Sequence, residues 1–270
     1  MTPSTRLPTL FIPHGGGPCF FMDPPPPLPR DLWDAMGTYL RGTAQSVGTQ
    51  PHAILIVSGH WATDVPTVNV APAHSLYYDY YGFPDHTYRL NYPVKGSPGH
   101  AARVRELLTR AGIGCDEEAT RGLDHGVFVP LMLVYPDADI PVVQLSLRKD
   151  MDATAHLQIG RALQPLRDES VLIIGSGMSY HNLRSMRIPG KGDAEASAFD
   201  AWLTAAVTDP ATRGYRLGKA HHTRPSAIPR SSIFYPCTSQ PARLDTTSAA
   251  SSSTIVFWEK PSRPISSADR

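Results

Sequence analysis

Short apolar segments bounded by glycine or proline are the feature that most constrains how this chain can fold. Each is five to eight residues long, the length of a buried strand. Between them lie segments with apolar residues spaced three and four apart, as in amphipathic helices. Strands are predicted at residues 8–13, 53–58, 67–71, 140–147 and 170–174, and helices at 30–42, 100–111, 151–166 and 193–208. This alternation predicts an α/β fold: a single-domain, layered α/β/α arrangement around a central, largely parallel or mixed sheet.

Length and charge exclude several classes of protein. A chain of 270 residues suits one large α/β domain. Its 25 basic and 24 acidic residues nearly cancel, so nothing favours a nucleic acid or an anionic membrane as partner. We see no secretory signal and no apolar run of about 18–20 residues. Cys19, Cys115 and Cys237 form no disulfide framework or zinc-type pair, so we expect a cytoplasmic protein.

The character of the sequence changes near residue 218. No glycine follows Gly218, serine becomes dense, and the periodic patterns fade. We therefore expect a domain at residues 1–218 and an atypical tail at 219–270. By composition alone the tail is typical of a disordered segment.

Histidines follow three of the predicted strands. His14 comes after residues 8–13, His60 after 53–58, and His181 shortly after 170–174. Ligands of open α/β sheets bind beyond the carboxyl ends of the strands, and histidine is the commonest metal ligand. A fourth histidine, His125, lies in a polar turn flanked by glycines. A single histidine after a strand is more often a hydrogen-bonded loop residue, but several such placements together indicate a metal site. For the others we expect surface positions: His52, His74, His86, His100, His156, His221 and His222.

Other motifs give weaker signals. The glycines at 15–17 are not followed by a helix, which argues against a phosphate loop. Gly175-Ser176-Gly177 lacks the spacing of a hydrolase nucleophile elbow. The aromatic segment at residues 77–84 is either a packed loop or a wall for a flat aromatic ligand. In the second case Tyr81, Phe83 and Pro84 would contact the substrate.

Six motifs in order resemble those of one family. LPTLFIPHGGGP, VSGHW, YYGFP followed by YRLNYP, GLDHGVFVPL, YPDADIPVVQLSL and GSGMSYHNLR are similar to the DODA-type branch of the class III extradiol dioxygenases, the family of the LigB catalytic subunit. The resemblance covers about residues 7–210. It implies a non-haem metal enzyme that opens a catechol ring with O₂.

The same resemblance suggests roles for the histidines. It implies that His14 and His60 bind the metal and that His125 and His181 are catalytic. His181 is assigned to the metal edge, with the role of acid/base as its alternative. Fe(II) is expected for activity, and Zn(II) is a possible occupant because affinity alone does not select iron. The expected partners are a small aromatic diol and O₂, with the chain as a monomer or homodimer.

One departure from the family concerns the C-terminus. The family carries a further ligand histidine there, in a Glu-X-His-Leu-Leu-Pro-Leu-like stretch that this chain lacks. We hypothesise that residues 219–270 are the remainder of the domain in a shifted reading frame. Shifted codons over residues 233–237 permit His-Leu-Leu-Pro-Leu, and those over 255–268 permit a family-like terminal strand.

The resulting prediction is an extradiol dioxygenase that the altered tail impairs. Two alternatives use the same histidines differently. One is a non-catalytic relative, either a Memo-like binding protein or a pseudoenzyme. The other is a zinc-dependent hydrolase.

Overall fold

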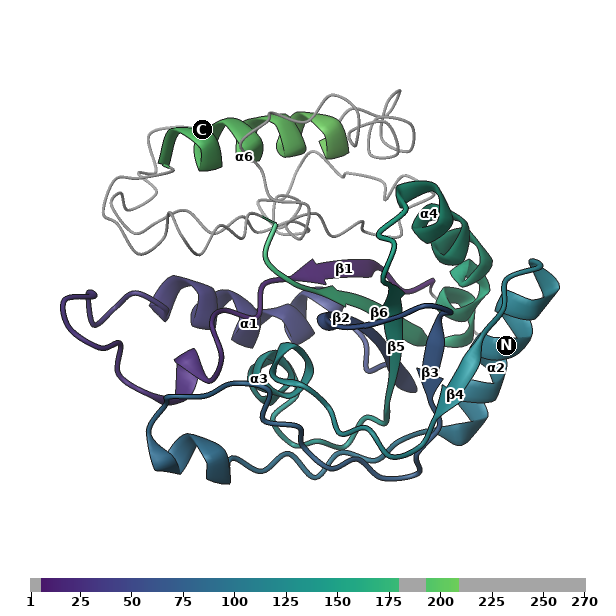
Figure 1. Cartoon of the computed structure of the whole chain (residues 1–270), viewed down its shortest axis with the longest axis horizontal. Helices are drawn as coiled ribbons and strands as arrows, with labels where there is room; N and C mark the ends of the chain where they lie inside the picture. The colour runs from purple at the N-terminus through teal and green to yellow at the C-terminus, as the bar shows by residue number, and fades with distance from the viewer. Residues whose placement is uncertain (1–5, 180–192, 209–270) are drawn as a thin grey trace.

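A six-stranded mixed sheet forms the centre of the molecule (Figure 1). The computed structural model describes residues 6–179 and 193–208. The strand order is β1-β6-β2-β5-β3-β4, with β3 antiparallel to β5 and the other neighbours parallel. The strands are β1 (Thr9–Ile12), β2 (Ala53–Thr63), β3 (Thr67–Asn69), β4 (Asp116–Glu118), β5 (Val142–Arg148) and β6 (Val171–Ser176). The predicted α/β fold with a mixed sheet is confirmed.

Helices connect the strands, and local sequence signals mark several of their ends. The α-helices are α1 (Asp34–Val47), α2 (Pro98–Arg110), α3 (His125–Val134), α4 (Ala153–Ala162) and α6 (Asp193–Thr208); the 3₁₀ helices are η1 (Cys19–Phe21), η2 (Asp85–Arg89) and η3 (Gln164–Glu169). Helix α1 is capped at its C-terminus by Gly48, whose left-handed backbone (φ 75°) suits glycine. Helix α2 begins with Pro98, which needs no N–H donor there. The Asp152 side chain caps α4 by accepting from the Ala155 N–H at 2.6 Å.

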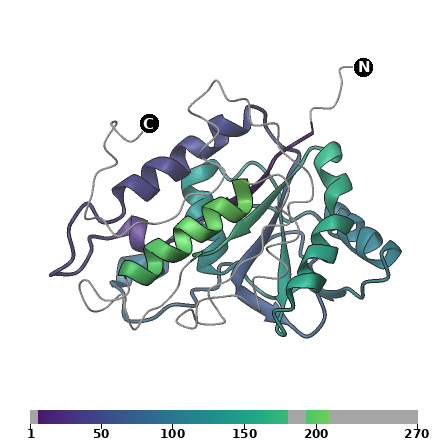
Figure 2. The same ribbon diagram turned by 90° about the horizontal axis from the view of Figure 1, so that it is seen from above.

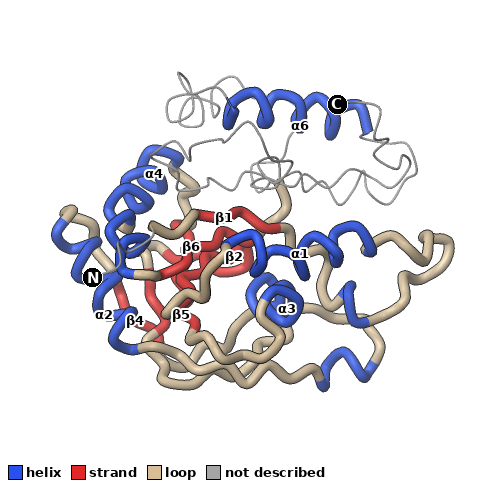
Figure 3. The backbone as a smooth tube through the Cα atoms, turned by 180° about the vertical axis from the view of Figure 1, so that it is seen from behind, coloured by secondary structure: helices blue, strands red, loops and turns tan. Residues whose placement is uncertain are grey.

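Two apolar cores lie on opposite faces of the sheet. Helices α1 and α3 cover one face, and α2 and α4 cover the other (Figures 2 and 3). Ile54 and Ile56 of β2 face the first core, whereas Leu55 faces the second. Because successive side chains of a strand point to opposite faces, the continuous apolar run of β2 supplies both layers.

The structure corrects two details that bear on the histidines. Strand β2 does not end before His60: it continues to Thr63, with a register shift on β5 between Val57 and Ala62. His125 does not lie in a turn but is the first residue of helix α3. That helix is buried around most of its surface, so it lacks the amphipathic pattern by which helices are predicted.

The remaining predictions concern the other histidines, the tail and membrane-spanning helices. His156 is buried, with 7% of its surface exposed, so the expectation of a surface position was wrong for it. His181, His221, His222 and the tail at 219–270 lie outside the described residues. Among the helices that the structure describes, none combines the length and apolar character needed to cross a membrane.

Candidate metal centre

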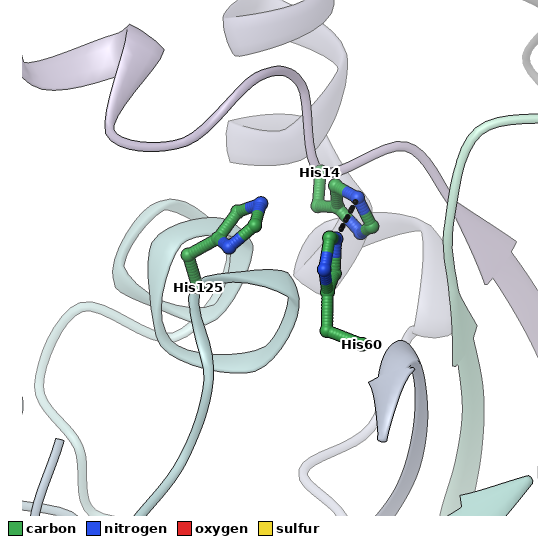
Figure 4. A group of neighbouring side chains, drawn as sticks. All are labelled: His14, His60 and His125. Atoms are coloured by element: carbon green, nitrogen blue, oxygen red, sulfur yellow. Dashed lines mark hydrogen bonds between the residues drawn. The ribbon is translucent and has the colours of Figure 1, made fainter. Parts of the chain in front are cut away.

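Three imidazoles from distant parts of the chain converge at one point on the α1–α3 side of the molecule (Figure 4). His14 follows β1, His60 lies in β2, and His125 begins α3. One ligand nitrogen from each lies within 4.8 Å of the other two. The His14 and His60 Nε2 atoms are 3.1 Å apart, and the His60 and His125 ring centroids are 4.0 Å apart. His14 and His125 are buried, whereas His60 faces solvent.

The tautomer of His14 can be assigned from the contacts of Ser176, which bonds to both His14 and helix α3. Pro130 has no N–H, so it offers no helical donor to the Gly126 carbonyl four residues earlier. The Ser176 hydroxyl donates to that carbonyl instead. Since this uses the single hydroxyl hydrogen, Ser176 Oγ must accept at its 3.1 Å contact with His14 Nδ1. We therefore assign the neutral His14 ring a proton on Nδ1 and a lone pair on Nε2.

Asp79 orients the other two histidines. Its Oδ1 accepts from His125 Nδ1 at 2.8 Å and from the His125 backbone N–H at 2.9 Å. Its Oδ2 lies 3.5 Å from His60 Nδ1, an ion-pair distance. Burial raises the pKa of Asp79, but the hydrogen bond and the charges of His125 and His60 outweigh it, so the pKa lies below its ordinary value. An ionised Asp79 directs the Nδ1–H groups toward itself and leaves the Nε2 lone pairs for the centre.

With these tautomers, the ring nitrogens at the centre can bind a cation. With protons on Nδ1, the two Nε2 atoms that lie 3.1 Å apart are both acceptors, so a proton or cation between them relieves their repulsion. Metal–nitrogen bonds of about 2.0–2.1 Å place two nitrogens of one ion about 3 Å apart. The donor set of His14, His60 and His125 therefore fits a transition metal that accepts imidazole ligands.

A buried carboxylate, Asp124, connects the chain segments that carry His60 and His125. Asp124, which is 0% exposed, accepts from Ser58 Oγ at 2.6 Å and from Gln144 Nε2 at 2.7 Å. It also pairs with Arg121 at 3.1 Å. The same Ser58 hydroxyl oxygen accepts from the His60 backbone N–H at 3.1 Å. This network ties the segment before α3 to the His60 backbone, so the two histidines are held relative to each other.

The backbone of α3 approaches β2 too closely for a side chain at Gly126. A Cβ atom there would overlap Ser58 Oγ and lie 3.0 Å from His60 Cδ2. Glycine is thus required for His125 and His60 to meet.

The aromatic segment at residues 77–84 borders the centre, where Asp79 and Tyr80 contact His125. Tyr81 is 91% exposed, and Pro84 is also exposed. Phe83 packs against Gly17, where a Cβ would lie 2.9 Å from the Phe83 ring. The buried Tyr80 ring stands edge-on to His125, with ring centroids 5.9 Å apart. The structure therefore brings Tyr80 to the histidines, and places Phe83 next to the turn that follows His14.

Comparison with known proteins places the chain in a family. Residues 8–226 match the family described as the catalytic LigB subunit of aromatic ring-opening dioxygenase. The chain belongs to the LigB family. It is 42% identical over 204 residues to a 4,5-DOPA dioxygenase extradiol of Beta vulgaris, a match that covers 74% of this chain and 73% of that protein.

Further relatives agree with the family assignment. The dioxygenase tasH of Hapsidospora irregularis is 43% identical over 190 residues, covering 68% of this chain and 58% of that protein. The crystal structure of an uncharacterized Escherichia coli K12 protein, JW3007, superposes with a TM-score of 0.60 at 31% identity, covering 80% of each chain. The LigB fold and the resemblance to extradiol dioxygenases are thereby confirmed.

Sequence reasoning found the three histidines but missed the residues that orient them. Asp79 lies among tyrosines, Ser176 between glycines, and Asp124 directly before His125. Asp79 and Ser176 carried no spacing signal, because the histidines they contact are 46 and 162 positions away in the sequence. The predicted contribution of His181 lies outside the described residues.

Proposed function

We propose that this LigB family chain is built as a metal-dependent extradiol dioxygenase that opens a catechol-type ring with O₂. The observation that supports this most is the convergence of one ring nitrogen from each of His14, His60 and His125 in a chain of this family. We further propose a cytoplasmic monomer or homodimer.

In this proposal His14 and His60 hold the metal, because their Nε2 atoms have the spacing of two ligands of one ion. Fe(II) is the proposed metal, and Zn(II) is a competing occupant. Bound iron would supply the electron transfer between substrate and oxygen that zinc does not support. His181 is proposed as a further ligand or as an acid/base.

His125 is the proposed base for the substrate hydroxyl. Its Nε2 carries the lone pair that takes a proton, and its Nδ1–H is held by the Asp79 carboxylate at 2.8 Å. The negative charge of Asp79 stabilises the imidazolium that forms. Tyr81, Phe83 and Pro84 are proposed as substrate contacts because their segment adjoins both His125 and the turn after His14.

The tail at 219–270 is proposed to be the remainder of the domain in a shifted reading frame. The family match ends at residue 226, which supports a change of sequence character near that point. Resequencing the gene and measuring the intact mass of the natural protein test this directly. A gene and a mass that both agree with the tail as written would contradict it.

Anaerobic loading with Fe(II), followed by oxygen and a panel of catechols, tests the function. A yellow ring-opened product with matching oxygen uptake supports the dioxygenase. Ester or amide turnover with zinc and without oxygen uptake would instead indicate a hydrolase. Metal binding without turnover of either kind would indicate a binding protein or pseudoenzyme. Running the assay on both versions of the tail separates an effect of the tail from an effect of the site.

A further inference from the structure

Asp79 is the one carboxylate among the described residues that contacts the Nδ1 atoms of two histidines of the centre. Its Oδ1 lies 2.8 Å from His125 Nδ1, and its Oδ2 lies 3.5 Å from His60 Nδ1. The carboxylate is mostly buried, with 11% of its side chain exposed. Each oxygen therefore has a different histidine to orient.

The chain around Asp79 is anchored on both sides. The Tyr77 backbone N–H donates to the Leu123 carbonyl at 2.8 Å. The Tyr78 hydroxyl donates to the Leu90 carbonyl at 2.6 Å, and the Tyr80 hydroxyl to the Thr87 carbonyl at 2.7 Å. Because its neighbours are held by these bonds, Asp79 keeps its position independently of the two histidines.

Ser176 contacts Nδ1 of His14, as Asp79 contacts Nδ1 of the other two histidines. It gives its hydrogen to the Gly126 carbonyl and accepts from His14 Nδ1 at 3.1 Å. Asp79 and Ser176 thus act on different histidines, from different elements of the fold.

We propose that Asp79 is the positioning residue that holds His60 and His125 as Nδ1–H tautomers, with Ser176 doing the same for His14, so that all three Nε2 atoms are ready to bind a metal or a proton. This inference deepens the proposed function and rests on it for the identity of the centre. Groups that hold the outer nitrogen of a ligating histidine fix the ring orientation and raise the basicity of the inner nitrogen.

The full-length chain with single substitutions tests this. In Asp79→Asn the retained oxygen still serves His125, while an amide N–H₂ replaces the oxygen that faces His60. Long-range ¹H–¹⁵N NMR of the metal-free protein should then show His60 shifting to the Nε2–H tautomer, with His14 unchanged. Ser176→Ala should shift His14 alone. Asp85→Asn, at an exposed carboxylate at the start of η2, is the matched control and should change no tautomer of the three.

The second readout is zinc affinity, measured by competition with a chelator. We expect the dissociation constant to rise about 10–100-fold in Asp79→Asn and Asp79→Ala, and to stay within about twofold in Asp85→Asn. An unchanged His60 tautomer in Asp79→Asn would overturn the inference, as would a changed tautomer with unchanged zinc affinity. If Asp79→Ala does not fold, the near-isosteric Asp79→Asn still decides. If the unsubstituted chain binds no zinc, the proposed metal site fails, whereas the tautomers still test Asp79.

Discussion

The Nε2 atoms of His14 and His60 lie 3.1 Å apart although 46 positions separate the two residues in the sequence. One residue follows β1 and the other belongs to β2, and β6 lies between these strands in the sheet. Their contact therefore depends on the order of the strands.

Replacing either of these histidines should abolish metal binding. In His14→Gln or His60→Gln one nitrogen of the closest ligand pair is lost, so we expect zinc or iron content near zero after dialysis, measured by elemental analysis. His52→Gln, at an exposed histidine outside the centre, should bind as much metal as the unsubstituted chain. Full metal content in both ligand variants would show that the centre is elsewhere.

We predict that His125 is a general base and is not required to hold the metal. His125→Gln should keep most of the metal and lose about 10²–10⁴-fold in turnover of a catechol, the usual contribution of a general base. Elemental analysis and oxygen uptake on the same sample separate the two effects. Loss of metal together with turnover would instead make His125 a third ligand.

Gly126 should not tolerate even one methyl group. In Gly126→Ala the new Cβ would overlap Ser58 Oγ and press on His60 Cδ2, so we expect the protein to lose about 1–3 kcal/mol of stability and to bind zinc more weakly. Urea denaturation and chelator competition measure these changes. Gly42→Ala is the control: it lies in α1 with nothing within 4 Å of its Cβ, and should stabilise by about 0.5–1 kcal/mol. Equal behaviour of the two variants would argue against the close packing at α3.

His156 should make the fold sensitive to acid. Burial lowers its pKa from the ordinary 6.5; Asp152 and Asp150 oppose this shift and Arg148 adds to it. The neutral ring accepts from the Arg148 N–H at 3.1 Å, and protonation removes this acceptor. Because the folded pKa is depressed, this stability is present above pH 6.5 and is lost as the pH falls through the folded pKa.

Urea denaturation at about pH 7.5 and about pH 5 checks this prediction. The unsubstituted chain should lose more stability between these values than His156→Gln, whose amide oxygen can still accept from Arg148. Equal losses in the two proteins would mean that the pKa of His156 is the same in the folded and unfolded states.

Much of the fold was predictable because apolar segments of strand length occur at the right places. Residues 8–13, 53–58, 67–71, 140–147 and 170–174 correspond to β1, β2, β3, β5 and β6. Strand β4 was missed because Asp116–Glu118 is short and entirely acidic. Helix α3 was missed because burial of most of its surface leaves no polar face to reveal the helical period.

The sequence by itself determined which residues were available for a site: histidines beside glycines, following apolar strands. It could not determine what holds them, because a hydrogen bond depends on atoms within about 3 Å and carries no sequence spacing. Ser176 is 162 positions from His14, and Asp79 is 46 positions from His125. Only the tertiary structure, by packing α3 against β2 and the 77–84 segment against α3, placed these partners where they hold the three converging imidazoles.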